Sequence, residues 1–96
     1  MLALPSALTQ TQATNCLRTL LRGLKSVTDK DVVLDASALT QFDSAALAVL
    51  LELRRETLAL GKSFAMQGIP PGLGNLATLY GIEELLPAIS VVPIVG

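Results

Sequence analysis

Two short β-type segments on either side of one helix-length segment are the feature that most constrains this fold. Residues Asp31–Asp35 read Asp-Val-Val-Leu-Asp, and residues 63–67 read Ser-Phe-Ala-Met-Gln. The three successive apolar residues of the first segment are typical of a strand covered on both faces. Between the two segments, Asp43-Ser44 is a strong helix-start signal, and Gly61 fits a left-handed end to a helix that reaches about residue 60. A strand, a crossover helix and a second strand joined by short connections predict a right-handed parallel βαβ unit.

Two further helices are predicted around this unit. Thr9 and Gln12 have the spacing of a capping box, and apolar residues recur with helical period from there to Leu24. A last helix is expected to begin near Pro71, because proline is favoured in the first turn of a helix, and to end at Gly81. The sequence therefore predicts an α/β fold.

Three stretches carry weaker signals. Residues 36–42 are expected to form a loop, and residues 83–86 to add one more helical turn. Residues 89–95 are apolar and β-branched, but Pro93 interrupts them. Such a segment is compatible with an edge strand or with a loose tail.

The composition limits the chemistry available to the chain. Its 96 residues, of which 51% are hydrophobic, suffice for one domain, which we expect to span residues 1–96. Histidine is absent, and the glycine spacing fits neither the Walker nor the dinucleotide pattern. Histidine-based catalysis and histidine metal sites are thereby excluded. We expect no enzymatic activity, no cofactor and no metal.

Charge and cysteine content indicate the compartment and exclude one class of partner. Seven basic and eight acidic side chains give a net charge of −1, which argues against binding to nucleic acid. Arg18, Arg22 and Lys25 share a helix face, which is interpreted as a solvated surface. No signal-peptide pattern is present, and the longest apolar run, residues 45–51, is too short for a bilayer. With the single Cys16, interpreted as a buried hydrophobe, this predicts a cytoplasmic protein without direct membrane insertion.

The first half of the central helix is apolar around its whole circumference. Residues 45–51 contain only Ala, Leu and Val, and charge returns at Glu52. A helix that rests on a sheet needs only one apolar stripe. The front of this helix is therefore either buried on two sides or presented to a partner protein, and in a domain this small the second interpretation is favoured.

Ser44, at the start of this helix, has two interpretations. In the first, Asp43 or Ser44 simply caps the helix, which is the commonest role of these residue types. In the second, Ser44 is a phosphorylation site or part of a contact surface. A phosphate there would be held by the free N–H groups of the helix start, and its charge would repel a partner.

Two stretches in this order resemble the STAS domain, found in sulfate transporters and anti-anti-sigma factors. Residues 32–39 read Val-Val-Leu-Asp-Ala-Ser-Ala-Leu, and residues 42–50 read Phe-Asp-Ser-Ala-Ala-Leu-Ala-Val-Leu. The family pattern is a strand ending in Asp-x-Ser, followed by Asp-Ser/Thr-x-Gly-Leu at a helix start, and Ala46 replaces its glycine. Residues 68–86 are similar to the MlaB-like branch.

The resemblance implies a small mixed β-sheet with helices packed mainly on one face and no catalysis. MlaB-like members are cytoplasmic subunits of an ABC transporter that moves phospholipid between Gram-negative membranes, where they bind and support the ATPase. The implied partners are that ATPase and its permease, and the implied location is peripheral to the inner membrane through this complex. The implied docking surface comprises Phe42, Asp43, Ser44, Ala45, Leu47 and Ala48.

Two alternatives stay open beside this reading. In sigma-regulating members of the family, the serine that corresponds to Ser44 is phosphorylated by a partner kinase, which switches binding off. The partners would then be a serine kinase or an anti-sigma factor. Nucleotide or lipid binding by the isolated domain is a further alternative, although no phosphate-binding motif supports it. The family has a fuller first strand than residues 2–8 offer, so an open sheet edge leaves a homodimer possible.

Overall fold

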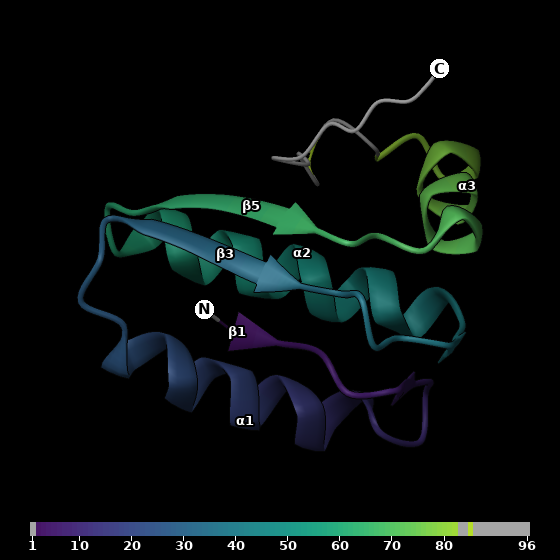
Figure 1. Cartoon of the computed structure of the whole chain (residues 1–96), viewed down its shortest axis with the longest axis horizontal. Helices are drawn as coiled ribbons and strands as arrows, with labels where there is room; N and C mark the ends of the chain where they lie inside the picture. The colour runs from purple at the N-terminus through teal and green to yellow at the C-terminus, as the bar shows by residue number, and fades with distance from the viewer. Residues whose placement is uncertain (1, 83–84, 86–96) are drawn as a thin grey trace.

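The computed structural model describes residues 2–82 and residue 85. Along the chain (Figure 1) the elements are β1 (Leu2–Ala3), β2 (Ala7–Leu8), α1 (Ala13–Ser26), β3 (Asp31–Asp35), β4 (Gln41–Phe42), α2 (Ser44–Ala59), β5 (Ser63–Gln67) and α3 (Pro71–Leu79). Three strands form one sheet in the order β1-β3-β5, and β2 pairs with β4 in a second sheet.

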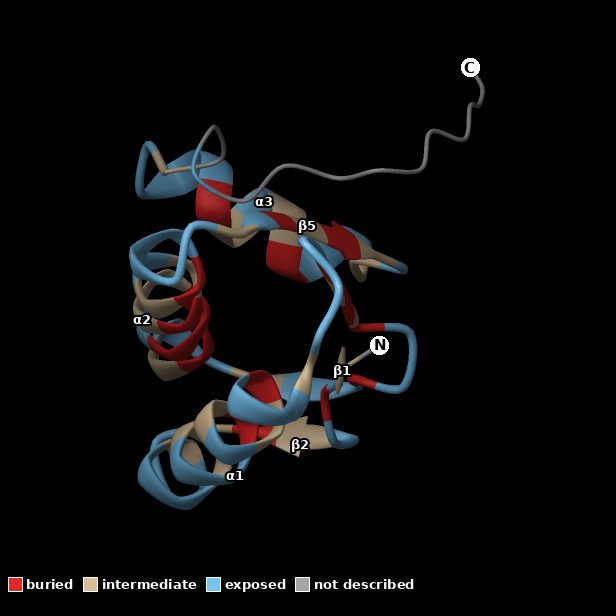
Figure 2. Ribbon diagram, turned by 90° about the vertical axis from the view of Figure 1, so that its left-hand side faces the viewer, coloured by how far each residue is buried: buried red, intermediate tan, exposed pale blue. Residues whose placement is uncertain are grey.

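The βαβ unit predicted from the sequence is confirmed. β3 and β5 are parallel, with Asp31 opposite Ser63 and Asp35 opposite Gln67, and α2 connects them. The pairs β1–β3 and β2–β4 are parallel as well, so all strand pairs within residues 2–82 are parallel. Figure 2 shows α1 and α2 on the same side of the three strands, which confirms an α/β fold with its helices mainly on one face.

Within the described residues, β3 and β5 have one core face and one partly exposed face. In β3, Val32 and Leu34 are buried, whereas Val33 between them is only half-buried, and β5 repeats this pattern. Among the described residues β3 is therefore fully covered on one face only, and the expectation that both faces are covered is not met there. Both long helices pack on the face that carries Val32 and Leu34, and the hydrophobic core lies between them and the sheet.

α2 is enclosed on two sides. Its buried residues cover more than one stripe and are Ala46, Leu47, Val49, Leu50, Leu53 and Thr57. The sheet takes up one side of the helix, and α1 packs along another. The all-round apolar front of α2 is thus explained mainly by burial within the domain, and the inference that it is chiefly presented to a partner is wrong.

Glycine conformations agree with the predicted turns. Gly61 and Gly81 follow α2 and α3 with φ of 76° and 71°, in the left-handed region that favours glycine. Gly68, after β5, has φ of 68°, and a Cβ built on it would lie 2.8 Å from the Cβ of Ser37. Both the backbone conformation and the close approach therefore require glycine at position 68.

Some boundaries differ from the predictions. α1 begins at Ala13, a turn later than the capping box implies, although the Gln12 side chain does accept the Thr9 N–H at 2.9 Å. The expected loop 36–42 contains β4, whose two residues pair with β2. The predictions for residues 83, 84, 86 and 89–95 lie outside the described residues. Within the described part, every helix is too short or too polar to cross a bilayer.

Candidate protein-docking site at the start of α2

Asp43 organises the start of α2. Its Oδ1 accepts the Ala45 N–H at 2.8 Å, which caps the helix as predicted. Its Oδ2 accepts the Gln10 N–H at 3.1 Å, although Gln10 is 33 residues away in the sequence. One carboxylate therefore holds the start of α2 against the turn that leads into α1.

Ser44 is the first residue of α2, and it is exposed. It lies where the backbone N–H groups of a helix have no partners within the helix and the dipole is positive. A shallow groove of about 380 Å³ opens beside it. The groove is lined by Gln10, Asp43, Ser44, Ala45 and Ala48.

A second groove continues from the first between the two helices. It has a volume of about 180 Å³ and is lined by Ala13, Thr14, Leu17, Ala45, Ala48 and Val49. Ala45 and Ala48 belong to both grooves, so methyl groups form the shared floor. The two form one feature, named here the α1/α2 groove, in which a partner side chain could approach the backbone of α2 closely.

The predicted docking residues differ in exposure. Asp43, Ser44 and Ala48 are exposed, and Ala45 is half-buried. Leu47 is only 2% exposed and belongs to the core. Its assignment to the surface is wrong, because its side chain lies on the inward face of α2.

Phe42 is half-buried at the end of β4 and packs against the core. Its ring lies against the start of α3, since a Cβ built on Gly72 would be 3.1 Å from the ring Cζ. Phe42 therefore connects the site to α3, and a substitution there would disturb packing as well as the surface.

Sequence reasoning did not identify the α1 side of the groove. Gln10, Ala13, Thr14 and Leu17 line it, but none of them belongs to a motif that points to docking. The hydrogen bond from Gln10 uses its backbone N–H, which every residue except proline carries. A backbone hydrogen bond of this kind does not depend on the residue type, so the sequence pattern does not indicate it.

Asp35 organises the loop after β3. Its Oδ1 accepts the Ser37 N–H at 3.0 Å. Hydrogen bonds from Ser37, first from its side chain and then from its backbone, hold the pKa of Asp35 below its ordinary value, against a smaller opposing effect of desolvation. An acid kept ionised in this way suits a structural acceptor better than a general acid.

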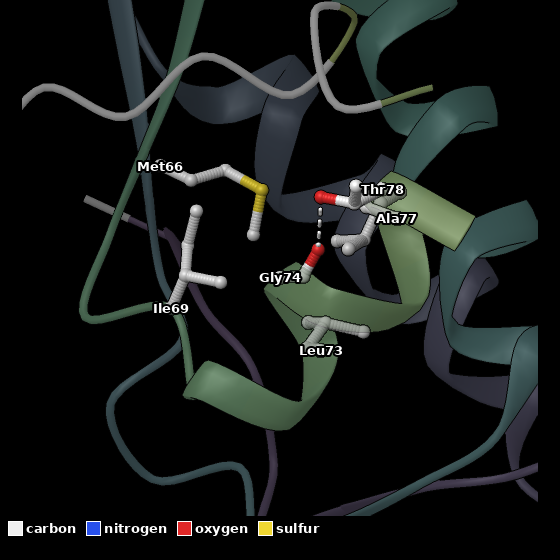
Figure 3. A pocket seen from close by; sticks show the side chains of 7 residues that line it. Met66, Ile69, Leu73, Gly74, Ala77 and Thr78 are labelled. Carbon is white, nitrogen blue, oxygen red and sulfur yellow. Dashed lines mark hydrogen bonds between the residues drawn. The ribbon is translucent and has the colours of Figure 1, made fainter. Parts of the chain in front are cut away.

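An apolar pocket of about 290 Å³ lies away from Ser44, between α2, β5 and α3. In Figure 3 the side chains of Met66 and Ile69 point toward α3, and none of the seven lining side chains is charged. The hydrogen bond drawn there runs within α3, from Thr78 Oγ1 to the Gly74 carbonyl at 3.1 Å. The pocket offers no charged group to orient a nucleotide or a lipid headgroup. Among the described residues, no three acidic or cysteine side chains gather as a metal site.

A family model described as Mlab, STAS domain matches residues 1–87. The chain belongs to this STAS domain family. The match agrees with the branch that residues 68–86 resemble. No curated protein matches the chain significantly.

Solved structures confirm the fold of this STAS domain. An anti-sigma-factor antagonist (STAS) domain protein from Planctomyces limnophilus superposes with a TM-score of 0.76 at 18% identity, over 94% of this chain and 80% of that chain. A serine-to-glutamate variant of RsbS from Moorella thermoacetica gives 0.68 at 28% identity, over 93% and 77% of the two chains. A chain from the stressosome, described as a signal integration and transduction hub, superposes with a TM-score of 0.64 at 29% identity, over 90% of this chain and 76% of that chain.

Proposed function

We propose that this STAS domain is a non-catalytic cytoplasmic subunit that binds and supports the ATPase of an ABC transporter. The transporter maintains outer-membrane lipid asymmetry by moving phospholipid. The Mlab family match over residues 1–87 carries this proposal. Contact with the ATPase and its permease would hold the domain at the inner membrane without insertion.

The α1/α2 groove is the docking surface in this proposal. Its floor of Ala45 and Ala48 is small and apolar, and Ser44 stands at its mouth. Asp43 fixes the two helix starts relative to each other before a partner arrives. Less conformational entropy is then lost on binding than with a mobile surface.

A single substitution in the groove tests the proposal. Ala48→Arg places a long side chain on the groove floor, and we expect it to weaken binding to the ATPase–permease complex about tenfold or more, which corresponds to about 1.4 kcal/mol. Ala59→Arg is the matched control, because Ala59 is exposed at the other end of α2. Affinity is measured with the detergent-solubilised complex. Equal affinities for Ala48→Arg and the unmodified chain would contradict the proposed surface.

A second candidate function is that of an anti-anti-sigma factor switched by phosphorylation of Ser44. Two structural neighbours, an anti-sigma-factor antagonist and RsbS, favour it. The exposure of Ser44 at the helix start would admit a serine kinase. In this case Ser44→Asp abolishes binding to the anti-sigma factor or kinase, whereas assembly with a transporter ATPase tolerates the substitution.

Affinity purification of the tagged chain from native cells distinguishes the two candidates. Recovery of an ABC ATPase with its permease supports the transporter subunit. Recovery of a serine kinase or an anti-sigma factor supports the phosphorylation switch. Ser44→Ala serves as the control, because it removes the phosphorylation site while introducing no charge.

A further inference from the structure

The outer face of α1 is basic, and charge is distributed unevenly along the chain. Arg18, Arg22 and Lys25 are all exposed on this helix. Residues 1–28 contain these three cations and no Asp or Glu, so their formal charge is +3. The remaining residues carry −4, which together gives the net charge of −1. The sequence alone is compatible with a solvated helix face, but the position of these cations in the fold indicates a binding surface.

Within residues 2–82, no ion pair involves these cations. The ion pairs in the described part of the chain join Arg55 to Glu52 and Glu56, all on α2. Arg18 donates one long hydrogen bond of 3.4 Å to the Asn15 side chain, on its own helix. The positive charge of α1 is therefore available to an external partner.

The row of basic residues begins, at Arg18, next to residues that line the α1/α2 groove. Thr14 and Leu17 line the groove. Arg18 lies one helical turn after Thr14 and directly follows Leu17 in the sequence. From Arg18 to Lys25 the cations extend along α1 for about 10 Å at 1.5 Å per residue. Figure 2 shows the outer side of α1 turned away from the sheet. Groove and cations thus form one continuous surface.

We propose that Arg18, Arg22 and Lys25, named here the α1 basic face, dock an acidic segment of the partner ATPase. This inference rests on the proposed function and specifies the chemistry of the partner. The segment places a small apolar side chain in the α1/α2 groove and carboxylates along the following 10 Å or so.

Two other anionic partners fit this surface less well. Nucleic acid would meet only three cations on a molecule of net negative charge. An anionic membrane would gain charge attraction but no apolar insertion, because Leu20 and Leu24 of α1 are buried in the core. A protein segment needs neither a large charge nor insertion.

Charges at the rim of an interface act mainly on the association rate and its salt dependence. The double variant Arg18→Glu/Arg22→Glu is therefore expected to slow association with the solubilised ATPase–permease complex on the order of tenfold at low ionic strength. The difference in association rate between the double variant and the unmodified chain should shrink as salt is raised, because the charges are exposed and screened.

The control has to change the charge away from α1. The double variant Lys30→Glu/Lys62→Glu changes the net charge by the same amount, but Lys62 holds the end of α1 through hydrogen bonds to Val27 and Asp29. The matched pair is therefore the single variant Arg22→Glu as the test and the single variant Lys30→Glu as the control, since Lys30 is exposed outside α1.

The outcomes separate this inference from the proposed function. Slower association for Arg22→Glu with an unchanged rate for Lys30→Glu supports the α1 basic face. Equal rates and equal salt dependence for the two variants, with binding still lost in Ala48→Arg, overturn the basic face and leave the proposed function standing. If the unmodified chain does not bind the complex at any salt concentration, both proposals fail. A last outcome is that the chain binds anionic but not zwitterionic vesicles, and that Arg22→Glu abolishes this binding without changing association with the ATPase. This outcome would assign the α1 basic face to lipid headgroups and overturn the protein partner.

Discussion

At the scale of single residues, two aspartates hold the loops around the candidate site. Asp35 and Asp43 each accept a hydrogen bond from a backbone N–H two residues later. Such contacts are local, so residue type and position predict them. The second hydrogen bond of Asp43, from Gln10, joins segments that are distant in the sequence, and no local pattern predicts it.

The lowered pKa of Asp35 predicts an acid-sensitive contribution to stability. A carboxyl whose pKa is lower in the folded state stabilises the fold at neutral pH, and this contribution is lost as the pH falls through the folded-state pKa. Asp35→Asn should therefore lower the free energy of unfolding at pH 7, and the difference from the unmodified chain should narrow in acid. Urea unfolding across the acidic range measures it. A difference that stays constant with pH would contradict an ionised role for Asp35.

At the scale of elements, α2 shows what a residue pattern can and cannot predict. Its start at Ser44 and the glycine after its end follow from capping chemistry, and both are confirmed. Which apolar residues face inward does not follow, because a helix that is apolar all round has no preferred side. For this reason the sequence does not show that Leu47 is buried and Ala48 is exposed. The two-residue strands β2 and β4 are too short to show a periodic pattern.

Two leucines of α2 provide a test of its enclosure. Leu50 is fully buried and borders the apolar pocket, whereas Leu58 is 45% exposed. Leu50→Ala should lower the free energy of unfolding by about 2–5 kcal/mol, since it removes buried contacts and enlarges a cavity. Leu58→Ala, the same substitution on the same helix, should cost less than about 1 kcal/mol. Chemical denaturation measures both, and similar costs would show that α2 is not buried as described.

At the scale of the whole molecule, the fold class was predictable because strand and helix lengths, start signals and short connections agree. The groove shared by α1 and α2 was not predictable, since it depends on how the two helices pack against each other and on the sheet. The unpaired edge of the sheet was expected from the short N-terminal segment, and β1 indeed lies at an edge within the described sheet.

This edge predicts self-association. Leu4 donates its N–H to the Asp35 carbonyl at 2.8 Å, and because alternate residues of a parallel strand face opposite sides, the Ala3 N–H points away from β3. We expect a dimer whose fraction rises with concentration. Ala3→Pro removes the outward donor and should leave a monomer, with Ala3→Ser as the control that keeps the N–H. Sedimentation velocity measures both, and a monomer at all concentrations would exclude pairing through β1.

The parallel pairing also has a consequence for synthesis of the chain. Leu2 pairs with Leu34, and Asp31 pairs with Ser63, so each of these partners is 32 residues from the other in sequence. No hairpin can therefore nucleate the larger sheet locally, and closing each connection costs entropy before any strand contact forms. On a ribosome, β3 could pair with β1, which is synthesised first, but its other edge would stay open beside the nascent α2 until β5 had left the exit tunnel. Early protection of that edge would fall to helix contacts or to chaperones rather than to β5.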